Sequence, residues 1–106
     1  MQKLSIIVPV YNEAKTIHLI LDKLKNLILI NNIKYEIIII NDFSTDDSHK
    51  ILIEYITNNQ ILDIKYFKHE QNFGKGAAIH TGINIATGDF LIIQDADLEY
   101  DPSEFN

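Results

Sequence analysis

Apolar positions along the chain change their spacing several times, and each change predicts a new element. Short runs of continuous apolar, β-branched residues alternate with longer stretches in which apolar residues recur every three to four positions. Continuous runs are typical of strands covered on both faces, and the longer spacing is typical of helices with one apolar face. The pattern predicts strands over 4–10, 35–40, 64–67 and 90–93, with helices over 17–31, from 46 to about 58, and 77–86.

Polar residues and one glycine are expected to mark the ends of these helices. Ser44 or Thr45 is expected to cap the second helix, because a side-chain oxygen can accept a hydrogen bond from a free amide of the first turn. Asp46 and Asp47 would then lie in that first turn, where the helix dipole favours acids. Gly88 is expected to cap the third helix at its C-terminus.

The strict alternation of strand and helix predicts an α/β fold with a parallel sheet and right-handed crossovers. With 106 residues the chain is expected to form one domain. Ligands of such folds bind outside the carboxyl ends of the strands, where the strand order reverses. Acids follow three of the predicted strands: Glu13 follows the first, Asp42 the second, and Asp95 with Asp97 the fourth.

The fourth strand ends in carboxylates spaced two residues apart. If the strand pleat continues, Asp95 and Asp97 point the same way and lie roughly 6.6 Å apart. At an effective dielectric of about 20 they would repel by roughly 2.5 kcal/mol, and a divalent cation would reverse that sign. Glu99 continues the spacing and could supply a third oxygen ligand, which predicts Mg²⁺ or Mn²⁺. The alternative is a solvated acidic turn.

Charge and composition restrict the partners of the chain. The net charge of −6 lies entirely in residues 76–106, which contain six acids and no lysine or arginine, while nine acids balance nine lysines before them. This distribution disfavours nucleic acid, which requires a basic surface, and favours a cation. There is no cysteine, so disulfides and thiolate metal sites are excluded. No run reaches the 18 or so apolar residues of a membrane span, so none is expected in this chain.

The segment Gly74-Lys75-Gly76 precedes the third helix. Glycines there would let the backbone approach a phosphate, and Lys75 would add a mobile positive charge. The alternative is an ordinary glycine-containing helix start with a solvated lysine. The segment is not a Walker A loop, since no serine or threonine follows the lysine. The histidines show no ligand spacing and are assigned to surface or helix positions: His18, His49, His69 and His80.

Four segments, in this order and at these intervals, resemble the amino-terminal half of a family 2 glycosyltransferase with a GT-A fold. They are Ile-Ile-Val-Pro-Val-Tyr-Asn-Glu at 6–13, Asn-Asp-Phe-Ser-Thr-Asp at 41–46, Asn-Phe-Gly-Lys-Gly-Ala-Ala at 72–78, and Gly-Asp at 88–89 leading to Asp-Ala-Asp-Leu at 95–98. The Gly-Lys-Gly-Ala-Ala and Asp-Ala-Asp-Leu-Glu segments are similar to those of polyprenyl-phosphate (dolichol-phosphate-like) sugar transferases.

The resemblance implies that residues 1–106 form the nucleotide-sugar-binding half of a Rossmann-like GT-A fold, truncated before the acceptor-binding half. It implies a UDP- or GDP-sugar donor, a polyprenyl phosphate or glycan acceptor, a role in cell-envelope polysaccharide synthesis, and a cytoplasmic location that includes the inner face of the membrane. The general base is expected beyond Asn106. The residues implied for the nucleotide-sugar are Pro9, Tyr11, Glu13, Asp42, Lys75 and Asp95; those implied for the metal are Asp95, Asp97 and Glu99.

Two positions depart from the family pattern, and two other functions stay open. Asn41 replaces the usual Asp and Phe43 the usual Gly, which matters if position 43 needs a positive φ. The chain could be an inactive fragment that binds nucleotide-sugar and metal. It could instead be a receiver-type signalling domain, although that class needs paired acids after the first strand. A dinucleotide-binding Rossmann domain is disfavoured because no Gly-x-Gly-x-x-Gly follows that strand. An open edge at 90–93 would favour self-association.

Overall fold

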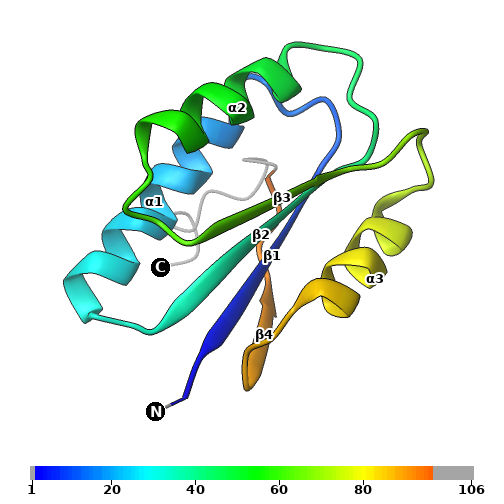
Figure 1. Ribbon diagram of the computed structural model, residues 1–106. Coiled ribbons are helices and arrows are strands. Elements are labelled where there is room, and N and C mark those ends of the chain that lie inside the picture. The colour runs from blue at the N-terminus through cyan, green and yellow to red at the C-terminus, as the bar shows by residue number, and fades with distance from the viewer. Residues whose placement is uncertain (1, 97–106) are drawn as a thin grey trace, which may run out of the picture.

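The computed structural model describes residues 2–96, and it confirms the predicted alternation of strand and helix. Asn32 ends the first helix in the left-handed conformation, close to the predicted stop. The elements in chain order (Figure 1) are β1 (Leu4–Val10), α1 (Ile17–Asn31), β2 (Tyr35–Asn41), α2 (Ser48–Asn58), β3 (Ile64–Lys68), α3 (Lys75–Ile85) and β4 (Phe90–Ile93).

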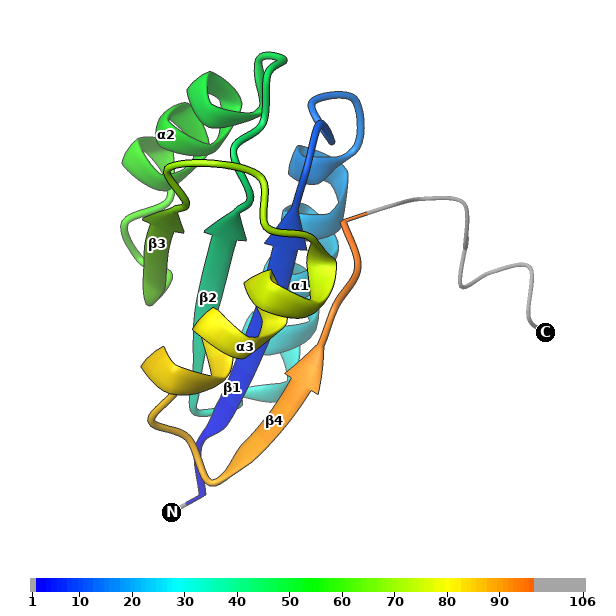
Figure 2. The ribbon, with the colours of Figure 1, turned by 90° about the vertical axis from the view of Figure 1, so that its right-hand side faces the viewer.

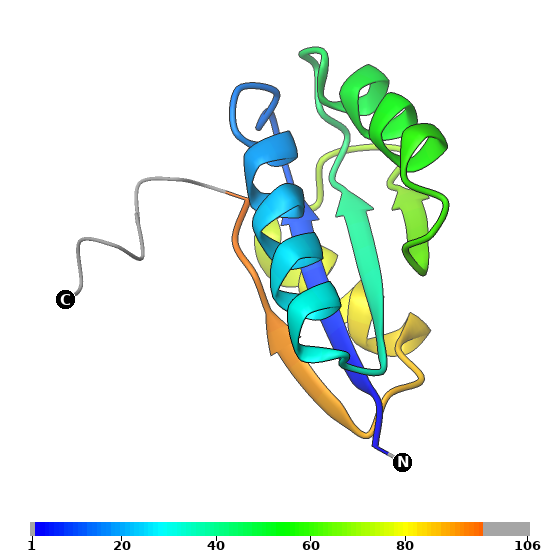
Figure 3. The same ribbon diagram turned by 90° about the vertical axis from the view of Figure 1, so that its left-hand side faces the viewer.

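The four strands form one parallel sheet in the order β3-β2-β1-β4. The chain therefore builds outward from β1 to β3 and then returns to the other side of β1 to add β4. The strand order reverses between β1 and β4, so their carboxyl ends are where a ligand site is expected. Figures 2 and 3 show the two faces of the sheet, with α3 on one and α1 and α2 on the other.

Alternate residues of the two central strands supply the two cores. Ile6, Val8 and Val10 of β1 pack with α1 and α2, together with Ile37 and Ile39 of β2. The intervening residues of β2 contact α3 in a smaller core that contains Ile38, Ile40 and Ala78. The continuous apolar run in β2 is thus covered on both faces, as predicted.

The prediction that the strand over 90–93 is covered on both faces is wrong. All four residues of β4 are exposed, between 44% and 53% of each side chain, in the part of the chain that the structure describes. The reason is topological, because β4 lies at the edge of the sheet and α1 and α3 pack mainly over the central strands. A continuous apolar run specifies a strand but not its place in the strand order.

The predicted helix caps are also wrong. The second helix begins at Ser48, and neither Ser44 nor Thr45 caps it. Asp46 and Asp47 precede the helix rather than lying in its first turn, and the Asp46 carboxylate accepts a hydrogen bond from the Ser48 amide at 2.9 Å. The third helix ends at Ile85 without a left-handed cap. The start of the second helix is set in part by the local contact between Asp46 and Ser48, and in part by contacts with the loop after β1, where the Glu13 amide donates to Ser48 Oγ at 2.9 Å.

A buried carboxylate joins the strands at the end of the sheet where β1 and β2 begin. The Glu36 side chain is fully buried and accepts hydrogen bonds from Ser5 Oγ at 2.6 Å, Lys65 Nζ at 2.5 Å and the Thr87 amide at 2.6 Å. Burial alone would raise the pKa of the Glu36 carboxyl, but these hydrogen bonds outweigh it and hold the pKa well below its usual range. The Glu36 network is this set of four residues.

None of the described helices is long and apolar enough to cross a membrane. The longest, α1, has 15 residues, whereas a membrane span needs about 20.

Candidate functional site

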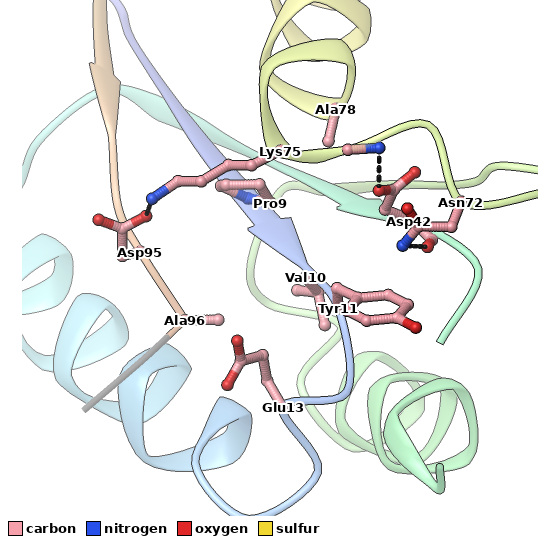
Figure 4. A pocket seen from close by; sticks show the side chains of 11 residues that line it. Pro9, Val10, Tyr11, Glu13, Asp42, Asn72, Lys75, Ala78, Asp95 and Ala96 are labelled. Carbon is pink, nitrogen blue, oxygen red and sulfur yellow. Dashed lines mark hydrogen bonds and ion pairs between the residues drawn. The ribbon is translucent and has the colours of Figure 1, made fainter. Parts of the chain in front are cut away.

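A pocket of about 400 Å³ opens at the carboxyl ends of the strands, beside the point where the strand order reverses. Four separate segments line it: the end of β1 with the loop after it, the end of β2, the loop before α3 with the first turn of that helix, and the segment after β4 (Figure 4). The lining residues are Pro9, Val10, Tyr11, Glu13, Asp42, Asn72, Gly74, Lys75, Ala78, Asp95 and Ala96.

All of the described residues that the sequence analysis selected as site residues line this one pocket. The parallel sheet brings them together, because each follows a strand or begins the helix that crosses back over it. They are Pro9, Tyr11, Glu13, Asp42, Lys75 and Asp95. Asp97 and Glu99 lie outside the described residues. Val10, Asn72, Ala78 and Ala96 also line the pocket, and the sequence analysis did not select them.

Asp42 is the most enclosed acid of the pocket, with 2% of its surface exposed. Its carboxylate accepts hydrogen bonds from the Phe73 amide at 2.9 Å, the Gly74 amide at 2.8 Å and His69 Nδ1 at 2.8 Å. Burial raises the pKa of the Asp42 carboxyl, but these donors outweigh burial and lower the pKa below its usual value. Asp42 is therefore ionised at neutral pH and holds the loop before α3 against the end of β2.

Lys75 and Asp95 form an ion pair across the mouth of the pocket (Figure 4). Both side chains are well exposed, 60% for Lys75 and 45% for Asp95. An exposed pair of this kind is worth at most about 1 kcal/mol, because water screens both charges. The two side chains can therefore separate at little cost.

Asn12 joins the loops after β1 and β2, a role that the sequence analysis missed. The side-chain oxygen of Asn12 accepts hydrogen bonds from the backbone amides of Thr45 at 2.7 Å and Asp46 at 3.2 Å. The backbone amide of Asn12 donates to Ser44 Oγ at 3.0 Å. Its φ of 53° lies in the left-handed region, which asparagine tolerates better than most residues. The signal available in the sequence was an asparagine in the loop directly after a strand.

Asn41, one of the two departures from the family pattern, is not among the residues that line the pocket. Its side-chain amide donates to the Tyr66 hydroxyl at 2.8 Å, and its oxygen accepts from the Ser44 amide at 3.0 Å. The Tyr66 hydroxyl also lies 2.7 Å from His49 Nδ1. An aspartate at position 41 would have to accept from the Tyr66 hydroxyl instead of donating to it, so the direction of this hydrogen bond would reverse.

Phe43, the second departure, adopts a φ of 61°, so this position does need the left-handed backbone. Its side chain is 41% exposed, and Lys68 Nζ lies 6.0 Å from the ring centroid. A side chain at such a φ is strained, because its Cβ crowds the carbonyl oxygen.

We expect Phe43→Gly to be more stable than Phe43→Ala by about 1 kcal/mol, because only glycine adopts this φ without strain. Both variants lose the ring and its contact with Lys68, so the difference between them isolates the backbone term. Urea unfolding of the two variants measures it. An alanine variant as stable as the glycine variant would contradict the conformation of this turn.

The assignment of His69 to the surface or to a helix is wrong. Only 7% of the residue is exposed, and it lies in the loop after β3. Its Nδ1 atom contacts Asp42 Oδ1 and its Nε2 atom lies 2.8 Å from Thr81 Oγ1 on α3. No local pattern indicates the position of His69, because its two partners lie 27 residues before and 12 residues after it.

The described residues offer one candidate ligand for a cation at the pocket. Asp95 offers an exposed carboxylate, the hard oxygen donor that Mg²⁺ and Mn²⁺ prefer. Among residues 2–96, no group of three or more His, Cys, Asp or Glu side chains could hold a metal ion by itself. The donor chemistry at the pocket fits a divalent cation, and the two other acids selected for it follow Asp95 directly along the chain.

Comparison with known proteins identifies the family. The sequence profile described as Glycosyl transferase family 2 matches residues 5–106. The chain belongs to this family. Because the chain belongs to this family, the alternatives of a receiver-type signalling domain and a dinucleotide-binding domain are rejected. Among curated relatives, an undecaprenyl-phosphate 4-deoxy-4-formamido-L-arabinose transferase from Photorhabdus laumondii is 34% identical over 105 residues. That match covers 97% of the chain and 31% of the relative, so the chain spans about a third of the length of this relative.

Solved structures share the fold. The mannosyltransferase PcManGT from Pyrobaculum calidifontis, in complex with GDP-Man and Mn²⁺, matches with a TM-score of 0.84 at 28% identity, over 91% of the chain and 28% of PcManGT. S. aureus TarS 1–349 in complex with UDP-GlcNAc matches with a TM-score of 0.74 at 30% identity, over 90% of the chain and 26% of TarS 1–349. The four-stranded parallel sheet is thus the amino-terminal, Rossmann-like half of the GT-A fold, as the sequence predicted.

Proposed function

We propose that this chain is the donor-binding half of a glycosyltransferase that uses a UDP- or GDP-sugar together with Mg²⁺ or Mn²⁺. The observation that carries the proposal is the pocket, which gathers Asp42, Lys75 and Asp95 from three segments at the strand-order reversal. The structural neighbours support it, because PcManGT is described with GDP-Man and Mn²⁺ and TarS with UDP-GlcNAc.

The inner part of the pocket is proposed to hold the nucleoside. Asp42 would accept a hydrogen bond from a base N–H, and an ionised acceptor makes the stronger bond. The ring of Tyr11 is 45% exposed at the pocket wall and offers an aromatic face to the base. Pro9 and Glu13 also line the pocket, and Glu13 would bind the base or the ribose.

The outer part is proposed to hold the diphosphate. Lys75 lies at the first position of α3, where free amides and the helix dipole favour an anion. Because its pair with Asp95 is exposed and weak, Lys75 can turn to a phosphate while Asp95 turns to a cation. Asp95, Asp97 and Glu99 are the residues that would hold Mg²⁺ or Mn²⁺. When bound, the cation would neutralise the diphosphate leaving group.

The acceptor is proposed to be a polyprenyl phosphate or a glycan, used at the cytoplasmic face of the membrane in cell-envelope synthesis. The relative from Photorhabdus laumondii, described as an undecaprenyl-phosphate transferase, supports this choice. No residue among 2–96 is assigned as the general base. Hydrolysis of a UDP- or GDP-sugar by the purified chain would separate a catalytic chain from a binding fragment, because only an assembled site cleaves the sugar–phosphate bond.

Titration calorimetry of the chain with UDP and GDP, with and without Mn²⁺, tests the proposal. We expect binding of at least one of them to need Mn²⁺ and to weaken about tenfold or more in Asp95→Asn, a loss of about 1.4 kcal/mol. Asp63→Asn is the matched control, because Asp63 is exposed where β3 begins, at the far end of the sheet from the pocket. If neither nucleotide gives a metal-dependent heat, the proposal is wrong.

A further inference from the structure

The carboxylate of Asp42 has one acceptor position left. An ionised carboxylate offers about four acceptor positions, two on each oxygen. His69 Nδ1 and the Phe73 amide occupy those of Oδ1, and the Gly74 amide occupies one of those on Oδ2. The remaining position is therefore on Oδ2, which is also the oxygen nearer to Gly74 and the wall of the pocket.

The hydrogen-bond partners of His69 require a hydrogen on its Nδ1 atom. An ionised carboxylate only accepts, so Nδ1 must carry a hydrogen and donate to Asp42 Oδ1. On the other side, the Thr81 hydroxyl lies 2.8 Å from Nε2 and 3.0 Å from the Ala77 carbonyl oxygen. The hydroxyl can donate to a neutral Nε2, or accept from a protonated Nε2 while donating to Ala77. The bond from Nδ1 to Asp42 is thus kept in both protonation states.

The ring of His69 is also fixed by packing. Phe67 and Phe73 contact it edge to face, with ring centroids 5.9 Å and 5.3 Å away. These contacts and the two polar partners leave the imidazole no free rotation. The position of the ring therefore depends on the segment after β2, on the loop before α3, and on α3 itself.

We propose that His69 is a positioning residue of the donor pocket, which holds Asp42 so that a single acceptor position on Oδ2 meets the base. This inference rests on the proposed function and refines it. One acceptor position suits a base that presents one N–H there, such as the imide of uracil. Guanine presents its N1–H and its amino group side by side, and Asp42 could pair with only one of them, which costs affinity. The donor is therefore a uridine diphosphate sugar.

The wild-type chain is tested with three probes in the presence of Mn²⁺: UDP, GDP, and UDP methylated at N3 of uracil. We expect GDP and the methylated UDP each to bind about tenfold or more weakly than UDP, a difference of about 1.4 kcal/mol for each tenfold. GDP binding as tightly as UDP would overturn the choice of base. Equal binding of UDP and its methylated form would overturn the contact with Asp42. Binding of none of the three would reject the proposed function and this inference with it.

Variants of His69 separate positioning from a purely structural role. His69→Asn keeps a nitrogen donor near the position of Nδ1, whereas His69→Leu removes it. We expect the asparagine variant to keep the preference of UDP over methylated UDP and the leucine variant to lose it. Thr81→Val is the matched control, because it removes the hydroxyl that contacts Nε2 and the Ala77 carbonyl but leaves the bond from Nδ1 to Asp42, and it is expected to keep that preference. A leucine variant that keeps the full preference would overturn the proposal.

Nitrogen-15 NMR of the histidine rings gives a test that needs neither a ligand nor a folded leucine variant. We expect the hydrogen of a neutral His69 ring to lie on Nδ1, the atom that donates to Asp42. An Nδ1 that loses its proton while Nε2 retains one would show that the bond to Asp42 is absent, and this would overturn the proposal even if UDP binds.

Discussion

Replacing Glu36 with alanine is expected to lower the free energy of unfolding by roughly 3 kcal/mol. The substitution leaves the buried Ser5 hydroxyl and the Thr87 amide without their acceptor, and it removes the ion pair with Lys65. The unpaired Ser5 hydroxyl is fully buried and costs about 1–3 kcal/mol, while the Thr87 amide, in an exposed residue, and the half-exposed Lys65 each add less. Urea unfolding at neutral pH measures the loss.

Glu54→Gln is the matched control for this prediction, because Glu54 is an exposed acid on α2. A surface substitution of this kind is expected to change stability by about 0.5 kcal/mol or less. A loss in Glu36→Ala no larger than in the control would show that Glu36 does not link the strands as described.

The same carboxylate makes stability depend on pH. Because the pKa of Glu36 is lower in the folded chain than in the unfolded chain, its contribution is complete above the unfolded pKa, about 4.3. It is lost as the pH falls below that value towards the lower pKa of the folded state. Wild type should therefore lose more stability than Glu36→Ala between pH 5 and about pH 3. Parallel slopes of the two proteins over that range would contradict the lowered pKa.

Gly88→Ala is expected to destabilise the chain by about 2 kcal/mol, within the range for overpacked sites. A Cβ at position 88 would lie 2.5 Å from Ser5 Oγ, 2.8 Å from the Lys3 carbonyl oxygen and 2.9 Å from the Ser5 amide. Two of these atoms belong to the backbone of the β1 region and cannot move aside cheaply. The Gly88 amide also donates to Ser5 Oγ at 2.8 Å, which couples this turn to the Glu36 network. Urea unfolding measures the change.

Gly76→Ala makes the same chemical change in the first turn of α3, where an added Cβ meets no atom within 4 Å. Alanine is favoured over glycine in a helix by roughly 0.5–1 kcal/mol, so this control is expected to be slightly stabilising. The two substitutions should therefore shift stability in opposite directions. Equal effects of the two substitutions on stability would contradict the close approach of Gly88 to Lys3 and Ser5.

The strands and the place of the pocket could be predicted because they depend on local patterns and on a general rule of parallel sheets. Apolar runs located all four strands, and the rule that ligands bind at the carboxyl ends brought Asp42 and Asp95 to one edge of the sheet. Neither step needs knowledge of which side chains touch.

The remaining features depend on contacts between residues that are distant in the sequence. Glu36 stands inside an apolar strand, and only the structure shows that Ser5 and Thr87 complete its site. Gly88 follows a helix, and this position predicts a helix cap. Glycine is needed there for another reason, because a side chain would collide with Ser5, 83 residues away. His69 has no motif of its own, and its role follows from the fold of the loop before α3.

The sheet order has a consequence for how the chain is made. β1 lies between β2 and β4, and Leu4 pairs with Phe90, a residue synthesised 86 positions later. At about 5–20 residues per second on the ribosome, that interval lasts roughly 4 to 17 seconds. During this time one side of the central strand is without its native neighbour and is accessible to chaperones or to another nascent chain. The pocket, which needs Asp95, is completed only after the interval has ended.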